Sequence, residues 1–239
     1  MDAGPGEPLG GEEPSEPVAE PVAVEPRWPV ALAISSFIAI TVVLHFAVPD
    51  HPRLGPGWLI PTVEIGMLAL LLAADPARIG SGSGRRRLRL ASLTLVLILA
   101  VAVLASTAKL IAELIQGSKV TQSATSLLAS GALVWLGNVL IFGLLYWLLD
   151  SGGPVARYRR ERPYPDFAFP QQLSPELAPA NWRPRYVDYL VLGLTTSTAF
   201  SPTDVMPMRA WAKLTMALQS IISLVVVGLV VARAVNVFS

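Results

Sequence analysis

Long apolar runs alternate with polar connections along most of this chain. Five runs approach the roughly 20 residues that a helix needs to cross the hydrocarbon core of a bilayer. They cover residues 28–48, 58–74, 88–115, 127–149 and 208–238. The pattern predicts an all-α, polytopic integral membrane protein with about five transmembrane helices.

A sixth apolar stretch, residues 186–200, is too short to cross the membrane. Its length predicts a re-entrant half-helix, which enters and leaves the bilayer on the same side. Irregular backbone at membrane depth is tolerated only where protein or a water-filled cavity surrounds it. We therefore expect this stretch to face other subunits or a pore.

These segments divide the chain into three parts. Residues 1–26 form a disordered, acidic and Pro-rich tail, and residues 27–125 form a three-helix peripheral membrane unit. Residues 126–239 form a channel-like pore unit, consisting of an outer helix (127–149), a polar surface loop (150–185), a half-helix with its loop (186–206) and an inner helix (207–238). Tyr146 and Trp147 at the end of the outer helix suit an interfacial aromatic belt.

Composition supports the membrane class, because 53% of the residues are hydrophobic and only 15% are charged. The first 26 residues hold seven acidic side chains, six prolines and no base, so they cannot bury enough apolar surface to fold. The chain has no cysteine, which excludes disulfides and thiolate chemistry. His45 and His51 stand without an acidic cluster, so no metal site is expected.

Basic residues are distributed unevenly between the two predicted sides of the membrane. With five crossings, one side receives twelve of them and the opposite loops receive only Arg53 and Lys119. The richer side is expected to be cytoplasmic, with the amino terminus inside. The half-helix then enters from the cytoplasm, and the orientation reverses if one segment does not cross. The twelve are Arg27, Arg78, Arg85, Arg86, Arg87, Arg89, Arg157, Arg159, Arg160, Arg162, Arg183 and Arg185.

Residues 195–207 read T-T-S-T-A-F-S-P-T-D-V-M-P and precede the last long apolar run. This frame resembles the pore loop of tetrameric potassium-type cation channels. The resemblance implies a homotetramer that passes monovalent cations. The constriction is then formed by Thr195, Thr196, Thr198, Ser201, Thr203 and Asp204.

Ser201, Pro202 and Thr203 occupy the positions of the Gly-Tyr-Gly triplet in that family. A potassium filter needs stacked rings of backbone carbonyls, and glycine permits the backbone angles that build them. Proline fixes φ near −65°, so a regular ladder is not expected here and cation selectivity should be weak. Four copies of Asp204 would form a carboxylate ring that attracts cations.

The same S-P-T-D run also has the pattern of a helix start. Ser201 would be the N-cap, Pro202 the first helical residue and Asp204 the acid of a capping box, with Arg209 neutralising it. On this alternative hypothesis the protein is a non-conducting membrane scaffold.

The last apolar run carries a polar stripe formed by Thr215, Gln219 and Ser223, with Arg233 further along. At 100° per residue these side chains share one face. The stripe fits the lining of a pore by an inner helix, and small polar residues fit tight helix packing equally well.

The last 90 residues also resemble an uncharacterised family of bacterial predicted membrane proteins. The resemblance is carried by Y-W-L-L-D-S-G-G-P (146–154), Phe169-Pro170, Y-V-D-Y-L (186–190), the T-x-T-x-F-S-P-T-D run, Gln219-Ser220 and A-R-A-V-N (232–236). It implies membership of the channel-like superfamily, and we expect a multi-pass protein of a bacterial cell membrane. No nucleotide-binding, nucleophile or metalloprotease motif is present, so we expect no enzyme activity and no cofactor. Membrane lipid and further copies of the chain are the expected partners, and nucleic acid is not.

Overall fold

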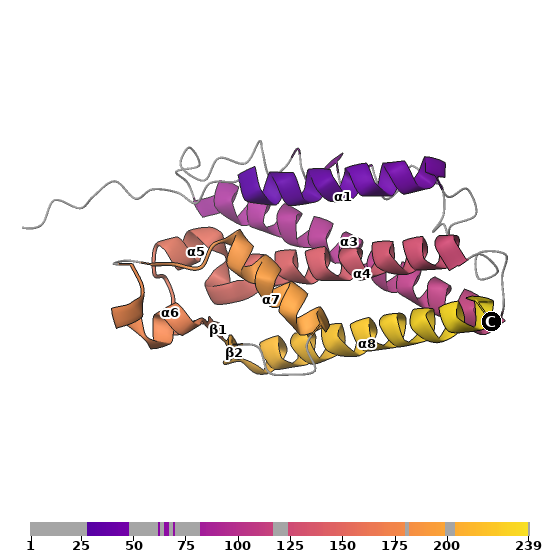
Figure 1. The fold of residues 1–239 in the computed structure, drawn as a ribbon. Helices are drawn as coiled ribbons and strands as arrows, with labels where there is room; N and C mark the ends of the chain where they lie inside the picture. The colour runs from indigo at the N-terminus through magenta and orange to yellow at the C-terminus, as the bar shows by residue number, and fades with distance from the viewer. Residues whose placement is uncertain are drawn as a thin grey trace, which may run out of the picture.

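The computed structural model describes residues 28–47, 62, 65, 66, 69, 82–116, 124–179, 182–198 and 204–238. Five longer helices dominate these residues (Figure 1). They are α1 (Trp28–Ala47), α3 (Gly82–Gln116), α4 (Ala124–Leu149), α7 (Tyr186–Thr198) and α8 (Ala210–Phe238). The predicted all-α class is confirmed.

Three of these helices have the length and composition of membrane-spanning helices, over Leu90–Gln116, Thr125–Gly152 and Ala210–Asn236. They correspond to the third, fourth and fifth predicted crossings. The first predicted crossing corresponds to the helix α1. The second, residues 58–74, lies outside the described residues except at four positions.

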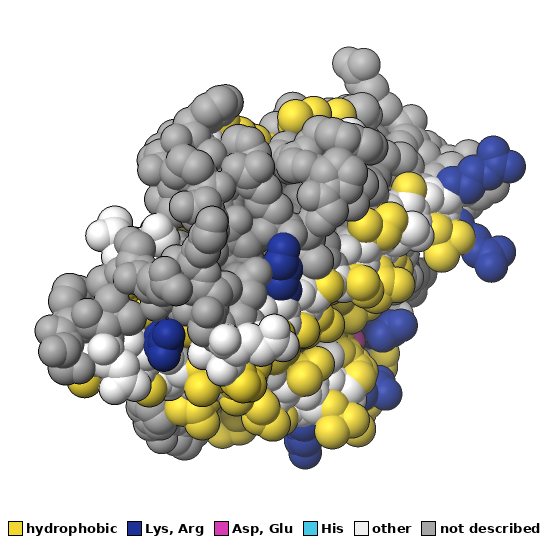
Figure 2. Space-filling model, turned by 90° about the vertical axis from the view of Figure 1, so that its right-hand side faces the viewer, with side chains coloured by type: hydrophobic (Ala, Val, Ile, Leu, Met, Phe, Trp, Pro, Cys, Tyr) yellow, Lys and Arg dark blue, Asp and Glu magenta, His cyan; other side chains and the backbone are white. Residues whose placement is uncertain are grey.

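The outward faces of these helices are apolar. Exposed leucine, isoleucine and valine side chains recur along α3 and α8, and Figure 2 shows hydrophobic side chains gathered over one side of the molecule. Such an extensive exposed apolar surface is typical of a protein embedded in a membrane. Examples are Leu97, Val101, Leu214, Ile221 and Val231.

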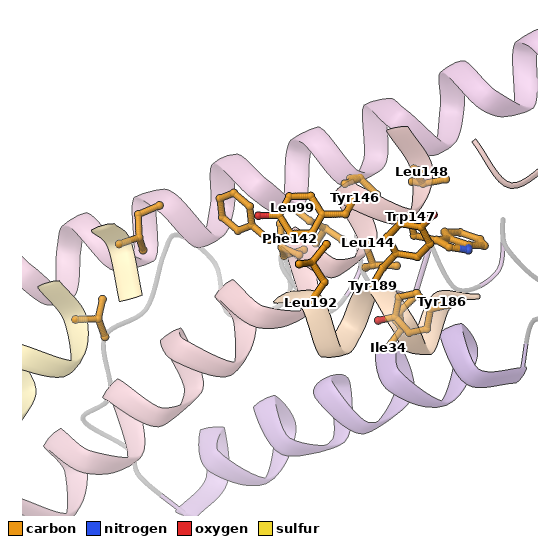
Figure 3. Close-up of a cluster of buried hydrophobic side chains, with 14 of the residues drawn as sticks. Ile34, Leu99, Phe142, Leu144, Tyr146, Trp147, Leu148, Tyr186, Tyr189 and Leu192 are labelled. Carbon is orange, nitrogen blue, oxygen red and sulfur yellow. The ribbon is translucent and has the colours of Figure 1, made fainter. Parts of the chain in front are cut away.

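The core of the described fold is centred on α4. This helix packs against α3, α7, α8 and α1, and its side chains meet those of α7 in an aromatic cluster. Figure 3 shows Trp147, Tyr186 and Tyr189 in this cluster, with Ile34 of α1 beside Tyr186. The rings of Trp147 and Tyr186 meet edge to face at 5.9 Å.

The interfacial belt predicted for Tyr146 and Trp147 is wrong in this structure. Tyr146 is fully buried and Trp147 is only 5% exposed, because α7 covers this end of α4. Both rings therefore belong to the packing between helices rather than to a surface that contacts lipid headgroups.

The predicted polar loop after α4 is largely folded. Residues 150–179, which we call the cap, contain η2 (Asp150–Gly152), α5 (Pro154–Tyr158), β1 (Phe167–Ala168), α6 (Pro170–Leu173) and η3 (Pro175–Leu177). β1 pairs antiparallel with β2 (Met206–Pro207), with Phe167 opposite Pro207. The cap is thus tied to the segment that leads into α8.

The sequence D-S-G-G-P makes the sharp reversal between α4 and α5. Ser151, Gly152 and Gly153 have positive φ values of 53°, 88° and 99°. Glycine adopts such values without strain, which explains the two glycines at this reversal. A Cβ at Gly153 would also approach the carbonyl of Leu148 to 3.1 Å. Pro154 then starts α5, where its missing N–H costs nothing.

The last helix begins later than the sequence predicted. α8 starts at Ala210, and Met206–Pro207 forms β2 instead of a first helical turn. Asp204 is therefore not the third residue of this helix, so the capping box predicted for α8 is wrong. Arg209 pairs with Asp166 rather than neutralising Asp204, with 3.1 Å between Nε and Oδ1.

Candidate functional site

α7 begins at one end of the helix bundle and stops near its middle. Its first residue, Tyr186, packs on Trp147 near the end of α4. Near its other end, Ser197 accepts a hydrogen bond from Gln219, nine residues into α8. At 1.5 Å per residue this contact lies about 14 Å along α8. α7 has 13 residues whereas α4 has 26 and α8 has 29, so α7 extends only about halfway along its neighbours.

The chain after α7 is found again at the end where α7 began. Met208 N donates to Asp166 O at 2.8 Å, and Asp166 N donates to Asp150 Oδ1 at 2.9 Å. Asp150 directly follows α4. Both connections of α7 are therefore at the same end of the bundle, while the intervening residues 199–203 lie outside the described part of the chain.

A helix that stops inside a bundle leaves its last carbonyls without helical partners. Side chains of α8 provide those partners. Ser220 Oγ donates to Thr196 O at 3.1 Å, and Ser223 Oγ donates to Ser197 O at 2.6 Å. The last carbonyls described in α7 thus accept hydrogen bonds from a neighbouring helix.

Gln219 of α8 connects this helix to α7 and to α4. It is fully buried, and its Nε2 donates to Gly193 O and Ser197 Oγ, both at 2.8 Å. Its Oε1 accepts from the Tyr146 hydroxyl of α4 at 2.6 Å. Every hydrogen-bonding group of this amide therefore has a partner, although the surroundings are apolar.

Two further side chains of α4 complete the arrangement. Trp135 Nε1 donates to Ser223 Oγ at 2.8 Å, and Asn138 Nδ2 lies 3.5 Å from both Ser197 Oγ and Gln219 O. We call the whole set the polar junction. It consists of Trp135, Asn138, Tyr146, Ser197, Gln219, Ser220 and Ser223.

Sequence reasoning had assigned no role at this position to Asn138, Ser197 or the Tyr146 hydroxyl. A signal was present for Asn138, because an amide inside an otherwise apolar run is expensive unless it has partners. Asn138 Oδ1 and Thr196 Oγ1 are buried without a hydrogen-bond partner among the described residues.

The residues predicted to form a constriction differ in how exposed they are in the structure. Thr198 and Asp204 are exposed and Thr195 is half-buried, whereas Thr196 is buried. The hydroxyls of Thr195 and Thr198 donate to carbonyls of their own helix. Ser201 and Thr203 lie outside the described residues.

The residues of the inner helix that were predicted to line a pore also differ in how deeply they are buried. Gln219 and Ser223 are enclosed by their own chain at 0% exposure, and their hydrogen bonds hold the end of α7 in place. Thr215 is half-buried, and its hydroxyl donates to Trp211 O at 2.9 Å. Gln219 and Ser223 pack between helices within this one chain, and the lining of a pore by the stripe stays a prediction.

A second polar cluster closes the cap over the end of α4. Asp150 is 1% exposed, and its Oδ1 accepts from Asp166 N, from Phe167 N at 3.3 Å and from Ser151 Oγ at 3.0 Å. The Tyr189 hydroxyl of α7 donates to its other carboxylate oxygen. One buried carboxylate thus joins α4, the cap and α7.

Asp166 extends this cluster to α8. Its carboxylate accepts from Ser151 N at 2.9 Å and pairs with Arg162 and Arg209. Arg157 adds a third link, because it donates to Trp147 O at 2.6 Å and lies over the Tyr189 ring. From the sequence we predicted only a polar loop here. The run D-S-G-G-P, which begins at Asp150, is nevertheless typical of a tight reversal.

Close backbone contact between α4 and α7 depends on Gly193. A Cβ there would lie 2.8 Å from Val139 O, so Gly193→Ala forces the two helices apart. We expect this change to lower the free energy of unfolding by about 1–3 kcal/mol, the usual cost of overpacking. Thermal unfolding in detergent micelles measures the effect.

Gly228→Ala on α8 is the matched control, because a Cβ there meets nothing within 4 Å. Alanine is the better helix former, so this control should be neutral or more stable. Equal losses in the two variants would show that α7 does not pack as closely on α4 as described.

Comparison of the chain with protein-family models, with curated proteins and with solved structures found no match. The part of the chain that the structure describes is mostly helical, and three of its helices are apolar enough to span a membrane.

Proposed function

We propose that this protein is a channel-like membrane protein that passes monovalent cations with weak selectivity as a homotetramer. One observation carries the proposal: α7 is a half-length helix whose end is capped at mid-bundle and whose two connections lie at one end. A long helix, a half-length helix and a second long helix, in this order, are the elements of a pore-loop unit.

The proposed path runs along the exposed surface of the subunit. Thr198 at the end of α7 and Asp204 after it are exposed polar groups. Around a fourfold axis, four Asp204 carboxylates would raise the local concentration of cations. Gln219 and Ser223 have a supporting role in this proposal, since they fix the end of α7.

For orientation we propose that the amino terminus and the cap face the cytoplasm of a bacterial cell. The arginines at the start of α3 and in the cap support this, because cytoplasmic flanks of membrane helices are rich in basic residues. The half-helix then enters the plasma membrane from the cytoplasmic side.

The second candidate is a non-conducting membrane scaffold. The closed hydrogen bonding of the polar junction favours it, because Gln219 and Ser223 are fully enclosed within one chain. The oligomeric state separates the two candidates. A monomer in lipid nanodiscs cannot build a ring around an axis and supports the scaffold.

Flux through purified protein in potassium-loaded liposomes tests the channel. We expect wild-type protein to release potassium faster than protein-free liposomes do, and Asp204→Asn to slow the release several-fold, because the carboxylate ring loses its charge. Glu176→Gln removes an exposed charge of the cap that is not part of the predicted constriction, and it should leave the rate unchanged. Background release by the wild type contradicts the proposed function.

A further inference from the structure

Two regions of opposite charge remain unused by the proposed path. Residues 1–26 contain seven acidic side chains and no basic one. Arg86 and Arg87 in the first turns of α3, together with Arg159 and Arg160 directly after α5, are exposed. We call these four side chains the arginine face.

The members of the arginine face lie at the same end of the bundle. α3 and α4 are consecutive, antiparallel neighbours, so the start of α3 lies level with the end of α4 (Figure 1). α5 follows α4 after the three residues of η2 and Gly153. Both pairs of arginines are therefore at the end that carries the cap.

Other arginines at this end are already used by the fold. Arg157 donates to carbonyls of Trp147 and Asp150, and Arg162 and Arg209 pair with the buried Asp166. The arginine face differs from them, because its side chains extend from the surface. Its charge is thus available to an anionic partner.

The acidic segment is attached at this same end. α1 begins at Trp28, and Ile34 lies beside Tyr186 in the first turn of α7 (Figure 3). Ile34 is six positions after Trp28, which corresponds to a rise of about 9 Å along α1. A chain of 26 residues spans up to about 85 Å when extended, so it reaches every part of the cap end.

We propose that residues 1–26 dock on the arginine face and shield it electrostatically. Tethering supports this, because a short connection gives the segment an effective concentration in the millimolar range. The contact is between exposed charges, so salt should weaken it: the Debye length falls from about 10 Å at 0.1 M salt to about 3 Å at 1 M. The proposal does not depend on ion conduction.

Distance measurements between two spin labels test the contact directly. The chain has no cysteine, so Ser15→Cys in the acidic segment and Tyr164→Cys on the exposed surface of the cap become the only labelling sites. In nanodiscs of neutral lipid at 0.1 M salt we expect a distinct population of short distances. We expect it to fall several-fold at 1 M salt.

Charge variants separate docking from incidental proximity. Changing Arg86, Arg87, Arg159 and Arg160 together to Gln should remove the short-distance population, whereas changing all four to Lys should retain it. Equal melting temperatures of the two variants confirm that both are folded. A distance distribution that is the same in wild type and in the Gln variant overturns the proposal.

Anionic phospholipid is the competing occupant of the same face. The measurement is therefore repeated in nanodiscs that contain about one third anionic phospholipid, a charge density typical of lipids that attract polybasic segments. Persistence of the short distances supports docking of the acidic segment. Their loss in these membranes overturns the proposal, because headgroups then hold the arginine face.

Discussion

Gln219→Leu should lower the free energy of unfolding by about 2–4 kcal/mol, the sum expected for the loss of three buried hydrogen bonds within a membrane bundle. The change leaves the hydroxyls of Tyr146 and Ser197 without this partner in an apolar surrounding. It also removes the link from α8 to Gly193 O. Unfolding by denaturing detergent, followed by circular dichroism, measures the loss.

Leu218→Ala is the matched control for this variant. Leu218 is the preceding residue of α8 and is 45% exposed, so its truncation should cost well under 1 kcal/mol. Tyr146→Phe removes only the donor to Gln219 Oε1 and should cost less than Gln219→Leu. A Gln219→Leu protein as stable as wild type would contradict the role given to the polar junction.

Asp150→Ala should be at least as destabilising, by about 3–5 kcal/mol. Two backbone N–H groups and two hydroxyls donate to this buried carboxylate, and all four lose their acceptor together. Each buried donor left unsatisfied costs about 1–3 kcal/mol before relaxation. Because the cap loses its attachment to α4 and α7, limited proteolysis should cut it faster.

Asp150→Asn keeps one acceptor oxygen and should fall between the wild type and Asp150→Ala. Glu176→Ala, at an exposed acid of the same cap, should stay within about 0.5 kcal/mol of the wild type. If Glu176→Ala and Asp150→Ala have equal effects, the buried cluster is not what holds the cap.

Hydrophobic length alone was enough to predict the long helices that the structure describes. The boundaries expected for residues 127–149 and 186–200 differ by only a few residues from α4 and α7, because long apolar runs have few other ways to satisfy their backbone. The start of α8 was less predictable. Ser-Pro-Thr-Asp has the pattern of a helix cap, but pairing of Met206–Pro207 with β1 delays the helix to Ala210.

The candidate site was predictable only in part. The sequence showed the stripe that contains Gln219 and Ser223. It did not show which neighbouring helices the stripe faces, because that depends on where α7 ends. Asp166 gave little local signal, because apart from Arg162 its partners are distant in sequence: Asp150 and Ser151 at the start of the cap, and Arg209 just before α8. Contacts between residues so distant in sequence follow from the tertiary arrangement and not from any short pattern.

The central claim is that α7 dips into the membrane and the chain returns on the same side. Single cysteines at Glu176 before α7 and at Met208 after it, both exposed, report the side directly in sealed vesicles. A membrane-impermeant thiol reagent should label both from one side, and should label a cysteine at Gln116, at the opposite end of α3, from the other side only. Labelling of positions 176 and 208 from opposite sides would show that α7 crosses the membrane and would contradict the account.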